Sequence, residues 1–270
     1  MAARRITSSG RRTKREQRPS QQEPRRRRIK IRISLLPGIL TTANVLCGFY
    51  AVMWAMKGRF FAASVAIVVA AVVDTFDGRV ARLTKTTSEF GVEFDSMADV
   101  ISFGVAPVIL AYHWALSSFG RAGGVVAFAY LICAVLRLAR FNTRCKTAEP
   151  KFFLGLPTPA AGLVVATSVL LADGEPVGTF LKVLFLIVFV CVSYLMISNV
   201  KYRSFKEFDF AKMHPFGTMI LVVAGVIVLA SFPGTMPFIL AFGYLVLGLV
   251  ETSMIKRRER RGALEQQEVP

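Results

Sequence analysis

Four aspartates between residues 74 and 99 are the best candidates for chemistry in this sequence: Asp74, Asp77, Asp95 and Asp99. On helices the first pair is spaced i,i+3 and the second i,i+4, so each pair projects from one helical face. Ionised carboxylates beside apolar segments are costly unless cations neutralise them. Two divalent cations would cancel the four negative charges, and ligands that are all oxygen favour Mg2+, or Mn2+ as a substitute. Such a pair of ions suits chemistry at a phosphate.

The residues between the two pairs fit a substrate that carries phosphate. Gly78 leaves the backbone approachable, and Arg82 can reach a phosphate or a carboxylate. For each aspartate taken alone, an ion-paired helix end at the membrane surface is an equally good interpretation. Four aspartates in this spacing favour a functional site instead.

The same residues resemble the signature of a known family. The string D-x2-D-G-x2-A-R-x8-G-x3-D-x3-D runs without a departure from Asp74 to Asp99 and is similar to that of the CDP-alcohol phosphotransferases, which are integral membrane enzymes. The resemblance implies a reaction in which an alcohol displaces CMP from a CDP-linked substrate. It also implies that Asp74, Asp77, Asp95 and Asp99 hold two metal ions and that Asp99 accepts the proton of the alcohol.

The resemblance further assigns residues to the CDP-linked lipid. Gly78, Arg82 and Ser88 fall where the family contacts the CDP moiety. Asn44 is a further candidate contact, because the family often has an asparagine at this place in the first span. Taken from the residues alone, the small and polar run at 41–44 is explained as well by close packing of membrane helices.

The composition predicts an all-α, polytopic integral membrane protein. Hydrophobic residues make up 54% of the chain and the mean hydropathy is +0.51, which is too apolar for a soluble domain. A helix needs about 20 apolar residues to cross a hydrocarbon core of ~30 Å. We expect about eight transmembrane helices, at 35–56, 60–78, 95–117, 124–140, 154–172, 180–198, 215–231 and 236–255.

Charge divides the chain into three expected segments and orients them. Residues 1–33 are predicted to be a disordered basic tail, 34–255 the transmembrane domain and 256–270 a second basic and polar tail. The net charge of +17 lies mainly in the tails and in alternate loops, which puts both termini and the aspartates at the cytoplasmic face. We expect the bacterial cytoplasmic (inner) membrane as the location, and anionic lipid headgroups, not nucleic acid, as the partners of the basic tail.

The end of the fourth predicted span is a candidate site for the acceptor. Arg137 and Arg140 lie i,i+3 on one helical face and Asn142 follows them. One interpretation is that these residues form an anion-binding face. Snorkelling of the two arginine side chains to the membrane interface explains their positions equally well. With Phe153–Ala161 and the residues after Asp95, this stretch resembles the phosphatidylserine synthase branch of the family. The resemblance implies CDP-diacylglycerol and L-serine as substrates, with Arg137 or Arg140 holding the serine carboxylate.

Two alternatives stay open at this point. Another acceptor, such as glycerol 3-phosphate, inositol phosphate or choline, fits the core motif equally, because that motif concerns only the CDP-linked half of the reaction. A cation carrier would use the four aspartates to line a transport path. Carrier sites lie near the membrane midplane at broken helices, whereas these acids lie at span ends. The family resemblance also implies a homodimer.

Overall fold

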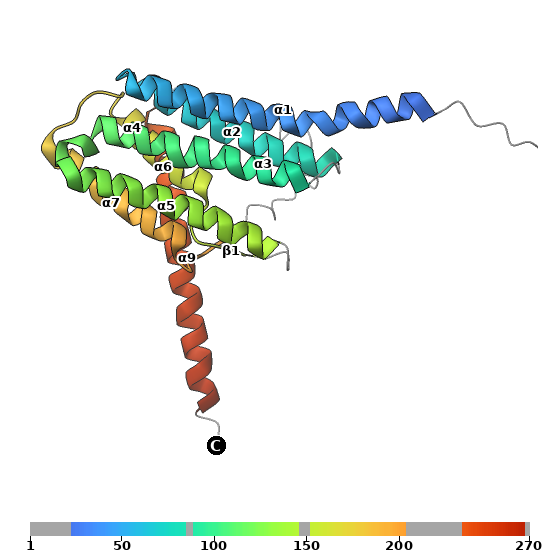
Figure 1. Ribbon diagram of the computed structural model, residues 1–270. Helices are drawn as coiled ribbons and strands as arrows, with labels where there is room; N and C mark the ends of the chain where they lie inside the picture. Colours follow the sequence, from blue (N-terminus) through green and yellow to red (C-terminus); the bar gives the residue numbers. More distant parts are fainter. Residues whose placement is uncertain (1–22, 85–88, 146–151, 204–233, 268–270) are drawn as a thin grey trace, which may run out of the picture.

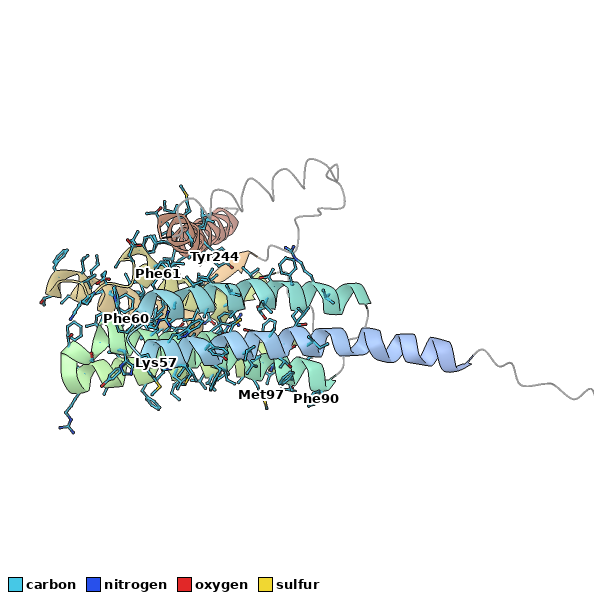
Figure 2. All side chains as sticks on the ribbon, turned by 90° about the horizontal axis from the view of Figure 1, so that it is seen from above. Lys57, Phe60, Phe61, Phe90, Met97 and Tyr244 are labelled. Atoms are coloured by element: carbon cyan, nitrogen blue, oxygen red, sulfur yellow. The ribbon has the colours of Figure 1, made fainter. Side chains whose placement is uncertain are left out.

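The computed structural model describes residues 23–84, 89–145, 152–203 and 234–267. Most of its helices lie side by side, and α9 crosses them (Figure 1). Figure 2, a view from above, shows α9 nearly end-on. The elements are α1 (Glu23–Met56), α2 (Phe60–Thr84), α3 (Glu89–Asp99), η1 (Val100–Val105), α4 (Ala106–Trp114), η2 (Leu116–Phe119), α5 (Gly120–Cys145), β1 (Phe152–Leu154), α6 (Thr158–Leu171), α7 (Thr179–Ile197), β2 (Lys201–Arg203) and α9 (Thr235–Gln267).

The helices confirm a polytopic membrane protein. Within the described residues, five are long and apolar enough to cross a membrane: Gly38–Met56, Phe60–Val80, Phe90–Trp114, Leu116–Thr143 and Thr179–Ile197. Two further apolar helices, Thr158–Leu171 and Thr235–Val250, are shorter. Large apolar side chains such as Phe49, Phe128 and Phe180 are exposed, as expected of a bundle surrounded by lipid. The predicted span at 215–231 lies outside the described residues, so the number eight stays a prediction.

A short strand pair was missed by the sequence analysis. β1 and β2 pair antiparallel, with Phe153 opposite Tyr202. Gly155 follows with a φ of +81°, and its N–H donates to the carbonyl of Val200 at 2.9 Å. These hydrogen bonds pair backbone groups at the start of the predicted span 154–172, which is therefore not helical there. α6 therefore begins only at Thr158, immediately after Pro157, which fits a helix start.

Both terminal helices extend past the predicted domain boundaries. α1 begins at Glu23, so residues 23–33 are helical and not disordered as predicted, while 1–22 lie outside the described residues. α9 continues through 256–267. Arginine, lysine, glutamate and glutamine are good helix formers, and each extension is joined to an apolar helix that has already formed its first turns.

Small side chains let α1 and α2 pack closely and so fix the position of the aspartates on α2. Ala51 and Ala55 of α1 are fully buried, as are Ala63 and Ala70 of α2. Without a hydrophobic force between helices in lipid, close backbone approach of this kind drives their association. In Figure 2, Lys57 and Phe60 mark the α1–α2 turn at one end of the bundle, and Phe90 marks the start of α3 toward the other.

A π-helical turn, η1, directly follows Asp99. The N–H of Ala106 bonds to the carbonyl of Ile101, five residues back. Pro107 has no N–H for the carbonyl of Phe103, four residues back, and the buried Tyr130 hydroxyl donates to that carbonyl at 3.2 Å. The helix thus widens at this proline beside the acids, a feature often found at functional sites.

We predict that Gly48→Ala destabilises the protein. A Cβ at this position would lie 2.5 Å from Ser102 Oγ and 2.9 Å from Ser102 Cα, so α1 and η1 would have to separate. Overpacking of this kind costs about 1–3 kcal/mol. Thermal unfolding in detergent measures the loss. Gly38→Ala on the same helix is the control, because its Cβ would meet no atom within 4 Å. Equal melting temperatures for the two variants would contradict the prediction.

Candidate active site

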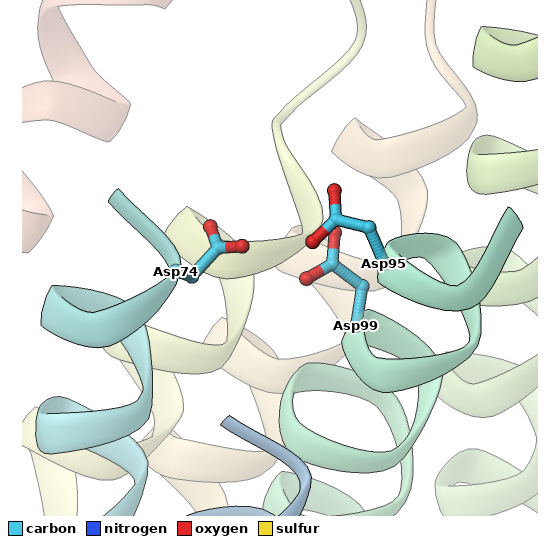
Figure 3. A group of neighbouring side chains, drawn as sticks. All are labelled: Asp74, Asp95 and Asp99. Atoms are coloured by element: carbon cyan, nitrogen blue, oxygen red, sulfur yellow. The ribbon is translucent and has the colours of Figure 1, made fainter. Parts of the chain in front are cut away.

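Three of the predicted aspartates face one another between α2 and α3. Figure 3 shows the carboxylates of Asp74, Asp95 and Asp99 pointing together, and one oxygen from each lies within 4.8 Å of the other two. Asp99 is 9% exposed, and its Oδ1 has no hydrogen-bond partner among the residues that the structure describes. The three side chains therefore face a common point and not the lipid.

The antiparallel arrangement of α2 and α3 explains why these residues meet. Two separations along the chain are equal: that from Asp74 to Thr84, the last residue of α2, and that from Glu89, the first residue of α3, to Asp99. Because every residue of an α-helix adds about 1.5 Å of rise, the two aspartates lie at the same depth. Asp95, one turn before Asp99, lies on the same face.

Asp77, the fourth predicted ligand, is turned toward α1. Its Oδ2 accepts a hydrogen bond from the Thr41 hydroxyl, and the residue is 4% exposed. Its Oδ1 is buried without a hydrogen-bond partner in the described part of the chain. Asp77 still lies within electrostatic range of Asp74 and Asp95. The fold thus gives three convergent carboxylates and a fourth next to them that is tied to the first helix.

These acids fit one or more hard divalent cations. All available ligand atoms are carboxylate oxygens, which Mg2+ and Mn2+ prefer. One oxygen each of Asp77 and Asp99 is buried without a hydrogen bond from any described residue, and such oxygens are costly unless something binds them. Bound cations would supply that interaction and would also offset the repulsion between the carboxylates.

Asn44 lies beside this group with an amide that no described residue binds. It is 1% exposed and one turn from Thr41 on α1, and neither its Oδ1 nor its Nδ2 has a hydrogen-bond partner in the described ranges. Its backbone carbonyl accepts a bond from Ser102 Oγ at 2.9 Å, which fixes the main chain there. A buried, unpaired amide costs on the order of 1–3 kcal/mol, so a ligand that pairs with it would be favoured.

The other residues assigned to the CDP-linked lipid are described less fully. A Cβ at Gly78 would meet no atom within 4 Å, so there is open space beside the backbone at this point of α2. Arg82 lies further along α2, and only its backbone is described. Ser88 lies outside the described residues.

Of the three candidate acceptor residues on α5, Arg137 is the one whose charge acts on Asp99. It is 7% exposed and within electrostatic range of Asp99. Its Nη1 donates to Thr158 Oγ1 at 3.1 Å, at the start of α6. This arrangement places a positive charge beside the carboxylate that is the expected proton acceptor.

Arg140 and Asn142 connect α5 to neighbouring helices instead. Arg140 donates to the carbonyl of Ile197 at 3.1 Å and to Asn199 Oδ1 at 2.5 Å, at the end of α7. Asn142 Nδ2 donates to Ser96 Oγ on α3 at 2.9 Å. Both side chains therefore link the end of α5 to a neighbouring helix. The bond of Asn142 also helps to fix α3, the helix that carries Asp95.

Two contacts to the predicted site residues were missed. Thr41 stood in the run at 41–44 that fitted helix packing, and Thr158 stood within Phe153–Ala161, a stretch that was interpreted only through the family resemblance. No spacing rule relates Thr41 to Asp77 or Thr158 to Arg137, because each pair is joined only when separate helices pack. A hydroxyl residue within an apolar span is the one signal that the sequence offers.

Comparison with known proteins supports the same region. The sequence profile of the CDP-alcohol phosphatidyltransferase family matches residues 34–193. A CDP-diacylglycerol–serine O-phosphatidyltransferase of Helicobacter pylori is 42% identical over 175 residues, covering 64% of this chain and 73% of the relative. One of Bacillus subtilis is 34% identical over 175 residues, covering 65% and 93%. An archaetidylserine synthase of Methanothermobacter thermautotrophicus is 35% identical over 169 residues, covering 62% and 69%.

The matched region contains every helix that contributes to the site. It runs from the first span, with Thr41 and Asn44, through the aspartates on α2 and α3 to Arg137 and Thr158. The profile thus covers more than half of the chain, together with all of the convergent side chains described above. The chain belongs to the CDP-alcohol phosphatidyltransferase family.

Proposed function

We propose that the protein transfers the phosphatidyl group of CDP-diacylglycerol to L-serine, forming phosphatidylserine and releasing CMP. The observation that carries this proposal is the pairing of convergent aspartates with Arg137. The aspartates suit a reaction at phosphate, and the cation next to them suits an acceptor that bears a carboxylate. Relatives from Helicobacter pylori and Bacillus subtilis that carry the name of this activity support the same conclusion.

In the proposed reaction the serine hydroxyl oxygen attacks the phosphorus that bears diacylglycerol. A new phosphorus–oxygen bond forms, the bond from that phosphorus to the oxygen shared with CMP breaks, and CMP leaves with the bonding electrons. Asp99 accepts the hydroxyl proton, for which its buried Oδ1, which no residue in the described part of the chain binds, is suited. A membrane-embedded site suits a substrate that carries two acyl chains.

The remaining site residues would bind and orient the donor. Asp74, Asp77, Asp95 and Asp99 are the proposed ligands of two divalent cations, Mg2+ or Mn2+, which when bound would neutralise charge developing on the pyrophosphate. The Asn44 amide, which has no hydrogen-bond partner among the described residues, and the space that a Cβ at Gly78 would enter support the proposed contacts of both residues with the CDP moiety. Arg82 and Ser88 are proposed contacts on the strength of the family motif.

The finer topology is also a proposal. We place eight transmembrane helices in a domain at 34–255, with both termini and the site at the cytoplasmic face of a bacterial inner membrane. The hydrogen bond from α5 to α3 and that from α5 to α7 put these helix ends near the site. Cations in the sequence near the end of α2, the start of α3 and the ends of α5 and α7 support a cytoplasmic side: Arg79, Arg82, Lys85, Arg144, Lys146, Lys151, Lys201 and Arg203. The homodimer stays a prediction.

We expect purified protein supplied with CDP-diacylglycerol and Mg2+ to release CMP when L-serine is added. CMP release should stop when a chelator removes the metal. Serine, glycerol 3-phosphate, inositol phosphate and choline are tested separately, and CMP is measured. CMP release with a different alcohol would support the same type of reaction but show that the acceptor is not serine. No release with any alcohol would overturn the proposed function and return the cation carrier to consideration.

Asp99→Asn is expected to abolish turnover while leaving the protein folded. The change keeps the shape of the side chain but removes the proton acceptor and one charge, and the loss of general base catalysis alone costs about 10²–10⁴ in rate. CMP release and circular dichroism measure the two effects. Glu93→Gln is the control, because Glu93 is an exposed acid on the same helix. Turnover at the wild-type rate in Asp99→Asn would contradict the proton-acceptor role.

Arg82→Ala is expected to weaken use of the CDP-linked lipid more than use of serine. Loss of a charge-assisted bond to phosphate predicts a rise of about tenfold in the KM for CDP-diacylglycerol in mixed micelles. Arg79→Ala, one turn earlier on α2, serves as the control for a general effect of removing a cation. A change confined to the KM for serine would show that Arg82 does not hold the nucleotide.

A further inference from the structure

Arg137 is held in one orientation by two neighbours. Thr158 Oγ1 accepts a bond from its Nη1 at 3.1 Å, and Thr158 itself is fully buried. The centre of the guanidinium also lies 5.3 Å from the centroid of the Phe141 ring. A guanidinium is planar and carries five N–H donors in a fixed fork, so the bond to the threonine and the stacking on the phenylalanine ring together orient its plane.

Arg140 differs from Arg137 although both are on α5. The Arg140 guanidinium bonds to the carbonyl of Ile197 and to Asn199, which holds it at the end of α7. Arg137 instead lies within electrostatic range of Asp99. Of the two candidate cations, Arg137 is therefore the one whose charge bears on the expected proton acceptor.

The covalent structure of serine fits a cation in such a position. Its hydroxyl and carboxylate are separated by only two carbon atoms, so a cation that binds the carboxylate must lie close to the base that takes the hydroxyl proton. We infer that Thr158 is a positioning residue that fixes the Arg137 guanidinium for the carboxylate of the acceptor, and that this pair selects a hydroxy amino acid. The inference rests on the proposed function.

A plainer role for the same contacts is charge balance. Arg137 could be held by Thr158 only to offset the negative charge of the aspartates. In that case the loss of the Thr158 hydroxyl would change the concentration of Mg2+ that gives half-maximal activity, and kcat would fall, while the KM for serine stayed constant. The inferred role predicts instead that the KM for serine rises and that the half-maximal Mg2+ concentration stays constant. Kinetic measurements therefore distinguish the two roles.

The test uses the full-length protein in detergent and three variants of α6. Thr158→Val keeps the shape but removes the hydroxyl, and it is expected to raise the KM for serine about tenfold or more, the effect of losing a hydrogen bond to a charged group. The KM for CDP-diacylglycerol and the half-maximal Mg2+ concentration should stay within twofold. Thr158→Ser restores the hydroxyl and should restore the KM for serine.

Thr167→Val is the matched control. Thr167 is also fully buried on α6, but its hydroxyl bonds to Leu163 and Val164 carbonyls of its own helix. This variant should keep the KM for serine. If Thr158→Val does not fold, Arg137→Lys tests the same inference, because lysine keeps the charge but lacks the planar fork; it should raise the KM for serine and leave the Mg2+ dependence unchanged.

The outcomes separate the inference from the proposed function. An unchanged KM for serine in Thr158→Val, or an equal rise in Thr167→Val, would overturn the inference while the wild-type protein still used serine. If Arg137→Lys is the variant measured, a shift in Mg2+ dependence without a change in the KM for serine would overturn it. Failure of the wild-type protein to release CMP with serine would overturn the proposed function itself, and the inference with it.

Discussion

Carboxylates that are buried or half-buried repel one another at the centre of this fold, and the surrounding helices must hold them together. Asp74, Asp95 and Asp99 direct oxygens to within 4.8 Å of one another in a largely apolar bundle, and Asp77 lies within electrostatic range of two of them. Charges at such distances repel strongly where water is scarce. The fold must therefore hold them together by packing, and the arrangement favours binding of cations and of a substrate whose charges complement it.

The packing that does so depends on small side chains and on one irregular turn. The buried alanines of α1 and α2 allow the backbones to approach, and Gly48 gives Ser102 room to bond to the main chain of Asn44. η1 immediately follows Asp99, and Tyr130 supplies a donor for the carbonyl that Pro107 leaves without its usual partner. Each contact attaches the segment after Asp99 to a different helix, so the position of that carboxylate is fixed from several sides.

Hydropathy predicted most of the helices because membrane crossing imposes a minimum apolar length, which is a property of each segment alone. The prediction from hydropathy and composition was wrong where contacts with a neighbouring segment determine the secondary structure. Residue 154 belongs to a strand because β2 pairs with β1, and α6 is consequently shorter than predicted. Residues 23–33 are helical although their composition predicted disorder, because they continue a helix that the apolar part of α1 has already started.

The sequence by itself determined the family, the four aspartates and the helical faces from which they project, since periodicity fixes which residues of one helix lie together. The contacts between helices could not be predicted in this way: Asp77 turns to Thr41, Arg137 acts on Asp99 while Arg140 binds the end of α7, and Thr158 bonds to Arg137. These contacts depend on the rotation and depth of one helix against another. Packing between helices sets both, and no spacing within a single segment contains that information.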